Sequence, residues 1–155
     1  MPINVDKTAD RISENNAIHF SETRLLDYQV LNNFFKMHNW IQRTENKWHD
    51  IINESYIVCT SWDKDKLIGT GRSMPQDRFC VFYDVAVHPD YERRGIGAKI
   101  IDIRVKDARD RKYSRVYAFV DAREPLLLFY EAMGFEKANL GGKKLNVYFM
   151  RKDIC

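Results

Sequence analysis

The stretch that decides the fold is DVAVHPDYERRGIGAKIID, residues 84–102. Its first part places Val85 and Val87 at the spacing of a β-strand, and Pro89 ends that pattern. Its second part repeats isoleucine at helical spacing, at positions 96, 100 and 103. The stretch therefore predicts a strand that leads, through a short charged turn, into a helix.

The predicted helix begins without an ordinary cap. Gly95 and Gly97 weaken a first helical turn and bring no side chain to bind its free amides. Those amides lack internal partners, and the helix dipole adds partial positive charge to them. Glycine also lets a phosphate approach the backbone closely. Residues 93–98 therefore indicate an anion site, above all for a pyrophosphate, with an empty glycine turn as the alternative.

Two other phosphate-binding patterns do not fit this turn. A P-loop requires Gly-x-x-x-x-Gly-Lys followed by Ser or Thr, which the chain lacks. A dinucleotide fingerprint requires a third glycine where Ile100 stands, and it opens a βαβ unit rather than following a hairpin.

Composition indicates one globular domain over residues 1–155. The chain is 45% hydrophobic and 30% charged, with a formal net charge of +3 at pH 7. Basic and acidic residues alternate along most of its length, so no concentrated basic face for nucleic acid is expected. We also expect no membrane segment, because no apolar run is long enough to cross a bilayer.

The cysteines favour a reducing compartment. Cys59, Cys80 and Cys155 are an odd set without Cys-x-x-Cys spacing, so neither a disulfide framework nor a zinc site is indicated. Cys59 and Cys80 lie in apolar runs and are expected to be buried thiols. No apolar signal core opens the sequence, and the expected location is therefore the cytoplasm.

The rest of the sequence predicts an α+β protein with a mainly antiparallel sheet. Apolar alternation, turn residues and helical spacing divide the chain into eleven expected elements. They are a strand at 17–20, helices at 27–38 and 44–53, strands at 56–62, 67–73 and 79–87, a helix at 95–111, a strand at 115–121, a helix at 125–133, and two strands, near 135 and at 146–152.

DVAVHPDYERRGIGAKII (84–101) closely resembles the acetyl-CoA-binding segment of the GNAT N-acetyltransferase superfamily, and LFYEAMGF (128–135) resembles its second signature. The order of expected elements matches over essentially the whole chain. The resemblance implies a GNAT-like mixed, mainly antiparallel central sheet flanked by helices on both faces. It also implies a transferase, an acyltransferase that uses acetyl-CoA as co-substrate and needs no metal.

The resemblance assigns roles to individual residues. A strand edge would pair with the pantetheine arm, a turn would hold the pyrophosphate, and Tyr130 would lie close to the CoA sulfur. Phe129 would lie against the coenzyme, whereas Arg123, which departs from the family pattern, could reach the phosphates or merely be solvated. The strand-edge residues are Val85, Ala86 and Val87, and the turn residues are Arg93, Arg94, Gly95, Ile96, Gly97 and Ala98.

Two positions depart from the family pattern. Glu92 stands where family members usually carry Gln or Arg, and its carboxylate would not favour a nearby phosphate. Arg123 stands where many members have Asn. Both departures leave open how tightly the coenzyme is held.

The expected reaction is attack of a free amine on the thioester, which requires a base. An alkylamine with a pKa of about 10.4 is neutral at pH 7 only roughly once in 2,500 molecules. Asp84 is the best-placed carboxylate for this task, although it could equally hold a strand bulge or the substrate ammonium. Tyr130 would protonate the leaving thiolate. Weaker candidates for the base are Glu54, His88 and Asp121.

The acceptor is expected to be a primary amine of a small molecule. One alternative is a protein N-terminus or lysine, which predicts an open groove rather than a closed pocket. Another is a non-catalytic acyl-CoA-binding module. Similar proteins commonly dimerise through the sheet, so a homodimer is an open expectation as well.

Overall fold

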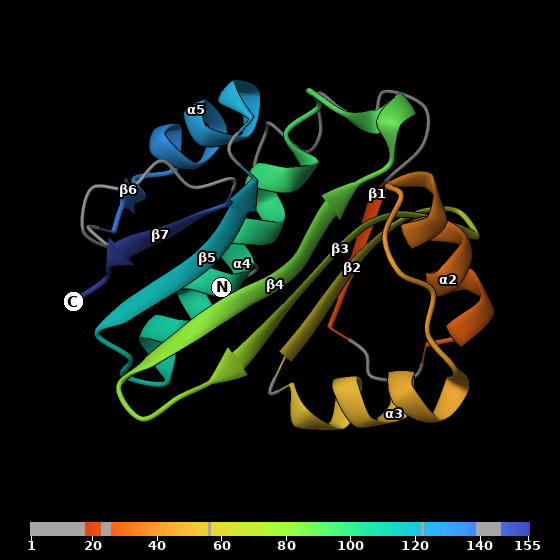
Figure 1. The fold of residues 1–155 in the computed structure, drawn as a ribbon, viewed down its shortest axis with the longest axis horizontal. Coiled ribbons are helices and arrows are strands. Elements are labelled where there is room, and N and C mark those ends of the chain that lie inside the picture. The colour runs from red at the N-terminus through yellow and green to blue at the C-terminus, as the bar shows by residue number, and fades with distance from the viewer. Residues whose placement is uncertain (1–17, 23–25, 56, 122, 139–146) are drawn as a thin grey trace, which may run out of the picture.

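The computed structural model describes residues 18–22, 26–55, 57–121, 123–138 and 147–155 (Figure 1). Its elements follow one another in the predicted order. They are β1 (Ile18–Ser21), α2 (Tyr28–Met37), α3 (Glu45–Glu54), β2 (Ile57–Asp63), β3 (Lys66–Pro75), β4 (Phe79–Val87), the 3₁₀ turn η1 (Pro89–Tyr91), α4 (Ile96–Asp110), β5 (Arg115–Asp121), α5 (Glu124–Ala132), β6 (Glu136–Lys137) and β7 (Val147–Asp153). The expected strand residues 17, 56 and 146 lie outside the described ranges.

The strands form one mixed, mainly antiparallel sheet, as predicted. Its order is β1-β2-β3-β4-β5-β7-β6. Only the β4–β5 pair is parallel among the pairs that the described strands make. Because β4 and β5 are joined by α4, this parallel pair is made by a crossover connection.

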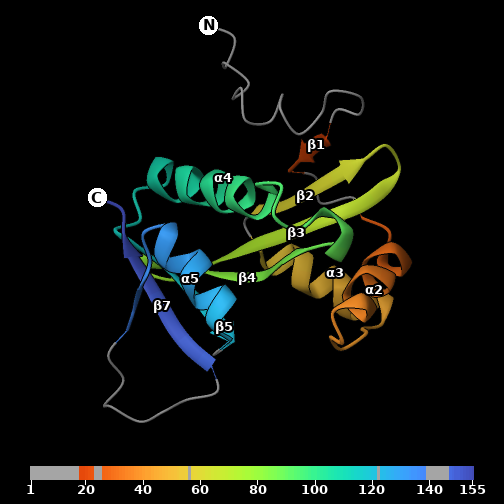
Figure 2. The same ribbon diagram turned by 90° about the horizontal axis from the view of Figure 1, so that it is seen from above.

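Helices cover both faces of the sheet, which confirms the expected layering (Figure 2). On one face α4 and α5 bury Ile101 and Tyr130 against Phe82 and other residues of β4, β5 and β7. On the other face α2 and α3 bury Phe35 and Ile52 against β2, β3 and β4. No helix in the described part of the chain is both long and apolar enough to cross a lipid bilayer.

The two N-terminal helices begin at residues that cap them in the usual way. The Asp27 carboxylate accepts a hydrogen bond from the backbone N–H of Gln29 at 2.7 Å. The Thr44 hydroxyl accepts one from the N–H of Lys47 at 3.3 Å. Helix α4 differs from both, since its N-cap is Gly95 and no side chain caps it.

Helix α4 lies close to the sheet because β3 offers glycine beneath it. A Cβ at Gly71 would stand 2.5 Å from Cγ2 of Ile100 on α4, which is closer than real Cβ contacts allow. The missing side chain at Gly71 therefore serves packing between this helix and the sheet.

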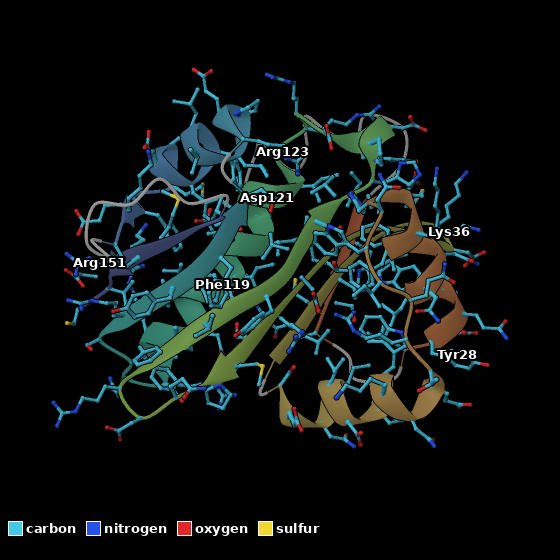
Figure 3. All side chains as sticks on the ribbon, in the orientation of Figure 1. Tyr28, Lys36, Phe119, Asp121, Arg123 and Arg151 are labelled. Atoms are coloured by element: carbon cyan, nitrogen blue, oxygen red, sulfur yellow. The ribbon has the colours of Figure 1, made fainter. Side chains whose placement is uncertain are left out.

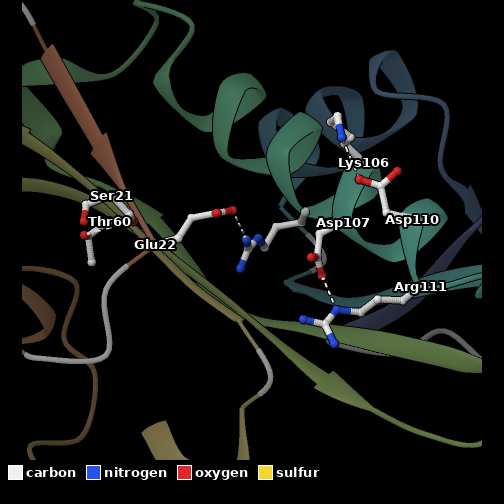
Figure 4. A network of polar contacts seen from close by, with 8 residues as sticks. Ser21, Glu22, Thr60, Lys106, Asp107, Asp110 and Arg111 are labelled. Carbon is white, nitrogen blue, oxygen red and sulfur yellow. Dashed lines mark hydrogen bonds and ion pairs between the residues drawn. The ribbon is translucent and has the colours of Figure 1, made fainter.

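A buried arginine joins α4 to the segment after β1 (Figure 4). The side chain of Arg104 is fully buried, and its Nη2 lies 3.5 Å from Oε1 of Glu22, which is half exposed. The adjoining strand end is held by the Thr60 hydroxyl, which donates to the carbonyl of Ser21 at 3.4 Å. On the exposed side of α4, ion pairs one turn apart join Lys106 to Asp110 and Asp107 to Arg111.

The cysteines have the burial that the sequence predicts. Cys59 and Cys80 are buried thiols outside any disulfide in the described part of the chain, whereas Cys155 is exposed. Burial raises the pKa of the Cys59 thiol to about 11, so this thiol stays protonated at neutral pH.

A β-bulge in β4 splits the sheet and creates the site. Pairing of β3 with β4 jumps from Thr70↔Ala86 to Arg72↔Tyr83, so residues 84 and 85 share one partner position on β3. The extra residue, Asp84, has a φ of 53°, in the left-handed region. Pairing of β4 with β5 ends at Phe82↔Ala118. Beyond that pair, the β5-facing edge of residues 83–87 has no strand partner among the described residues.

Candidate active site

The turn after η1 presents free amides, as the sequence indicates. Gly95 is the N-cap of α4 with φ 79°, and no side chain caps the helix. The first helical hydrogen bond runs from the N–H of Lys99 to the carbonyl of Gly95 at 3.0 Å. The amides of residues 96–98 therefore precede the helical ladder, and they carry the positive end of the α4 dipole.

Packing within the protein does not require glycine at position 97. A Cβ at Gly97 would lie 3.4 Å from Cζ of Phe129 and 3.5 Å from Cγ2 of Val87, which are ordinary contact distances. The protein itself would therefore tolerate alanine here, unlike at Gly71. The bare backbone is explained by a ligand that must come close to it. The same distances show that the turn, the free edge of β4 and α5 meet at one place.

Arginines flank the turn. Arg93 and Arg94 are both exposed, and Arg93 has a left-handed φ of 59°. The guanidinium of Arg94 lies 4.9 Å from the centroid of the Tyr91 ring. Tyr91 is itself fixed, because its hydroxyl donates to Oδ2 of Asp63 at 2.6 Å. Glu92 is exposed, so its carboxylate is not buried against the turn.

The predicted strand residues alternate between the two faces of the sheet. Val85 and Val87 pack with the α4 side, and Ala86 is buried with α2 and α3. Ile96 is buried and Ala98 is half-buried, so their amides rather than their side chains are available to a ligand.

Asp84 occupies the bulge, and its carboxylate is already engaged. Nε of Arg72 donates to Oδ2 of Asp84 at 2.7 Å, and both side chains are largely buried. Nη1 of Arg72 is 3.4 Å from the Ser55 hydroxyl, and its guanidinium lies 4.8 Å from the Tyr83 ring centroid. The Thr70 hydroxyl donates to the carbonyl of Asp84 at 2.7 Å. These contacts fix the carboxylate and leave Oδ1 as the oxygen that an amine could reach.

Tyr130 lies on the opposite side of the sheet from the Asp84 carboxylate. It is 6% exposed within the core cluster under α4 and α5, and its ring is 5.3 Å from that of Phe135. Burial raises the pKa of Tyr130 above its ordinary value, so its hydroxyl remains a proton donor at any physiological pH.

The remaining candidates lie around the end of β5 and the loops. Arg123, the N-cap of α5, donates to Oδ2 of Asp121 at 3.2 Å, and both side chains are exposed (Figure 3). His88 accepts a hydrogen bond at Nδ1 from the N–H of Asp90, as a turn residue does. Glu54 is exposed at the end of α3. Within the described ranges, no three His, Cys, Asp or Glu side chains gather where they could share a metal ion.

A small cavity lies between α2, α3 and the bulge. Its volume is ≈ 20 Å³, and Arg72 and Asp84 close one end of it. The rest of its lining is mainly apolar and includes Phe35 and Trp48, whose rings stack 5.2 Å apart. Phe35 and Trp48 are therefore core residues, and the cavity holds little more than one water molecule.

The sequence alone does not pair Arg72 with Asp84. Arg72 is a single charge within an otherwise apolar strand, and such a pattern is a usable signal for a buried partner.

A split mixed sheet, with an uncapped helix start beside its free strand edge, is suited to an extended phosphorylated ligand. A family model described as "Acetyltransferase (GNAT) family" matches residues 23–135. The chain therefore belongs to the GNAT acetyltransferase family and is an acyltransferase.

Two relatives show the range of similar sequences. One is the uncharacterized N-acetyltransferase ycf52 of Porphyra purpurea, 26% identical over 149 residues that cover 93% of this chain and 84% of the relative. Another is the histone acetyltransferase TAP1 of Glycine max, 26% identical over 109 residues that cover 63% of this chain and 46% of the relative.

Solved structures share the fold at lower identity. The ribosomal-protein-S18-alanine N-acetyltransferase from Escherichia coli superposes with a TM-score of 0.75 at 16% identity, covering 88% of this chain and 94% of that one. The structure of Arabidopsis thaliana NAA60 in complex with acetyl-CoA superposes with a TM-score of 0.73 at 17% identity, covering 88% of this chain and 99% of that one. These likenesses confirm the expected GNAT fold.

Proposed function

We propose that this chain transfers the acetyl group of acetyl-CoA to a primary amine. The observation that carries the proposal is the start of α4, where a left-handed Gly95 and a bare Gly97 leave backbone amides open beside the free edge of β4. A coenzyme with a diphosphate and a peptide-like arm matches both features. Bound acetyl-CoA supplies the activated acetyl group.

The coenzyme would be held mostly by backbone. The amides of residues 96–98 would bind the diphosphate, with Arg93 and Arg94 adding positive charge. The free edge of residues 85–87 would pair with the arm as an added strand. Glu92 is exposed, so a site built on amides tolerates its charge.

Two side chains on opposite sides of the sheet would manage the protons. Asp84, fixed by Arg72, would accept a proton from the amine directly or through one water. Tyr130 would give its proton to the departing thiolate. Burial raises the pKa of Tyr130, which keeps the phenol protonated and also makes it a weaker acid. The amine nitrogen gains the acetyl group, and the carbon–sulfur bond breaks.

The first candidate acceptor is a small primary amine, and the second is an amine on a protein. The cavity beside Asp84, at ≈ 20 Å³, lies in the core and encloses neither acceptor, so it does not choose between them. The name of the relative TAP1, a histone acetyltransferase, favours the second.

Two measurements test the proposal. Calorimetry with CoA should show binding by the purified protein. Thiol release from acetyl-CoA, followed with a panel of small amines and of peptides with free N-termini or lysines, should show which class is acetylated by mass spectrometry. CoA binding without turnover on either panel would leave a non-catalytic binding module, and absence of CoA binding would refute the proposal.

A further inference from the structure

His38 ends α2 with its ring held in place. It is the C-cap of the helix, and its backbone N–H donates to the carbonyl of Phe35 at 3.0 Å. The ring centroid lies 5.1 Å from that of Phe34 and 5.5 Å from that of Trp40. Backbone and ring are both fixed, so the imidazole is preorganised.

One nitrogen of this fixed ring lacks a hydrogen-bond partner in the described part of the chain. Nε2 of His38 is buried and has no hydrogen-bond partner among the described residues. A buried polar atom in this condition costs folding free energy, and each such atom calls for an explanation. A phenylalanine would keep the same ring contacts without that cost. The nitrogen is therefore explained if a ligand supplies its partner.

The surroundings of His38 identify that ligand. Glu92, His88 and Arg123 are close enough to act on its pKa, and they come from the loop before α4, the end of β4 and the start of α5. Figure 1 shows the end of α2 below the loop that carries η1. The end of α2, which His38 caps, therefore lies near the interval between the free edge of β4, which ends at Val87, and the turn that begins at Arg93.

His38 is neutral at pH 7. Burial is the main cause that lowers its pKa, His88 and Arg123 lower it further, and Glu92 opposes them. A neutral imidazole has one donor and one acceptor nitrogen, which suits an amide. A phosphate offers only acceptors and is better matched by the two arginines of the turn.

We propose that His38 is a coenzyme-binding residue whose Nε2 forms a hydrogen bond with an amide of the pantetheine arm. The contact lies where the arm passes from the edge of β4 to the turn at Gly95. This inference rests on the proposed function, since it requires CoA to bind there.

The test separates the two halves of the coenzyme. Wild type, His38→Phe and His38→Gln are titrated by calorimetry with CoA and with 3′-phospho-ADP, the nucleotide half that lacks the arm. We expect His38→Phe to weaken CoA about tenfold, the value of one hydrogen bond, and to leave 3′-phospho-ADP unchanged. His38→Gln places an amide near the Nε2 position and should recover most of the affinity. His49→Phe, on the exposed side of α3, is the matched control and should change neither ligand.

Thermal unfolding without ligand supplies a second readout. His38→Phe should unfold at the wild-type temperature or above it, because an unpaired buried nitrogen is removed while the ring stays. The inference is overturned if His38→Phe binds CoA like wild type, if both ligands weaken equally, or if His38→Gln binds CoA as weakly as His38→Phe. If the wild-type protein fails to bind CoA, both the proposed function and this inference are overturned. If wild type binds CoA and turns over but neither His38 variant changes CoA affinity, only this inference is overturned.

Discussion

Replacing Gly97 by alanine tests the stability of α4 separately from the affinity for its proposed ligand. The added methyl group would meet Phe129 at 3.4 Å and Val87 at 3.5 Å, so the protein accommodates it. Alanine is favoured over glycine in a helix by about 0.5–1 kcal/mol. For a domain of this size, such a gain raises the unfolding temperature by about 1–4 °C. Gly97→Ala should therefore be as stable as wild type or slightly more stable.

We expect the same methyl group to hinder a diphosphate that approaches the amides of this turn. Hydrogen bonds to charged groups contribute about 1.5–3 kcal/mol each. Weakening one or two of them lowers affinity by about 10- to 100-fold. Calorimetry with CoA measures this loss, and differential scanning fluorimetry without ligand measures the stability.

Gly71→Ala is the matched control for Gly97→Ala. Its Cβ would stand 2.5 Å from Ile100, so it should destabilise the fold while the folded fraction keeps its CoA affinity. Gly97→Ala that binds CoA as tightly as wild type would refute our explanation of the bare turn. A Gly97→Ala protein much less stable than wild type would refute it as well, since the glycine would then serve packing.

Tyr130→Phe should lower kcat by about 10- to 1,000-fold without changing the Kd for CoA. Tyr28→Phe, on the far side of the sheet, should change neither quantity. A kcat of Tyr130→Phe equal to that of wild type across the pH range would remove Tyr130 from the mechanism. Asp84→Asn should reduce kcat by at least about tenfold. It should also destabilise the fold by about 2 kcal/mol, because it weakens a hydrogen bond to the largely buried Arg72. Full activity of this variant with free amines at pH 7 would exclude Asp84 as the base. Burial lowers the pKa of both His38 and His88 in the folded protein. As pH falls, these histidines therefore take up protons in the unfolded chain before they do so in the folded protein. The free energy of unfolding should reach its full value above about pH 6.5 and decrease as the pH falls through the lowered pKa values. Urea unfolding at several pH values should show this slope, and the slope should flatten in His38→Phe; a slope unchanged in that variant would contradict the assignment for His38.

The sequence predicted the elements well because local signals agreed with the tertiary fold. The strand at 115–121 has the observed bounds, and the helix expected from Gly95 begins at Ile96. Gly95 was also predicted as an uncapped helix start, and the structure bears this out. The apolar spacing that predicts these elements and the glycine that leaves the helix uncapped are properties of neighbouring residues, so a single sequence is enough to predict them.

The site could be predicted only in part, since contacts across the sheet leave no local trace. Asp84 was a candidate from its position beside the strand, but the partner that fixes its carboxylate, Arg72, comes from the neighbouring strand. His38 reaches the same region from α2, more than forty residues away in sequence from Glu92 and on the other face of the sheet from α4. Only the register of β3 against β4 and the packing of α2 bring these residues together.

The unfinished pairing between β4 and β5 sets a limit on engineering. A variant whose strands joined along their full length would gain backbone hydrogen bonds and heat resistance, but would lose the opening that admits the coenzyme. Directed evolution for thermal tolerance alone should therefore drift toward inert proteins, unless each round also selects for turnover.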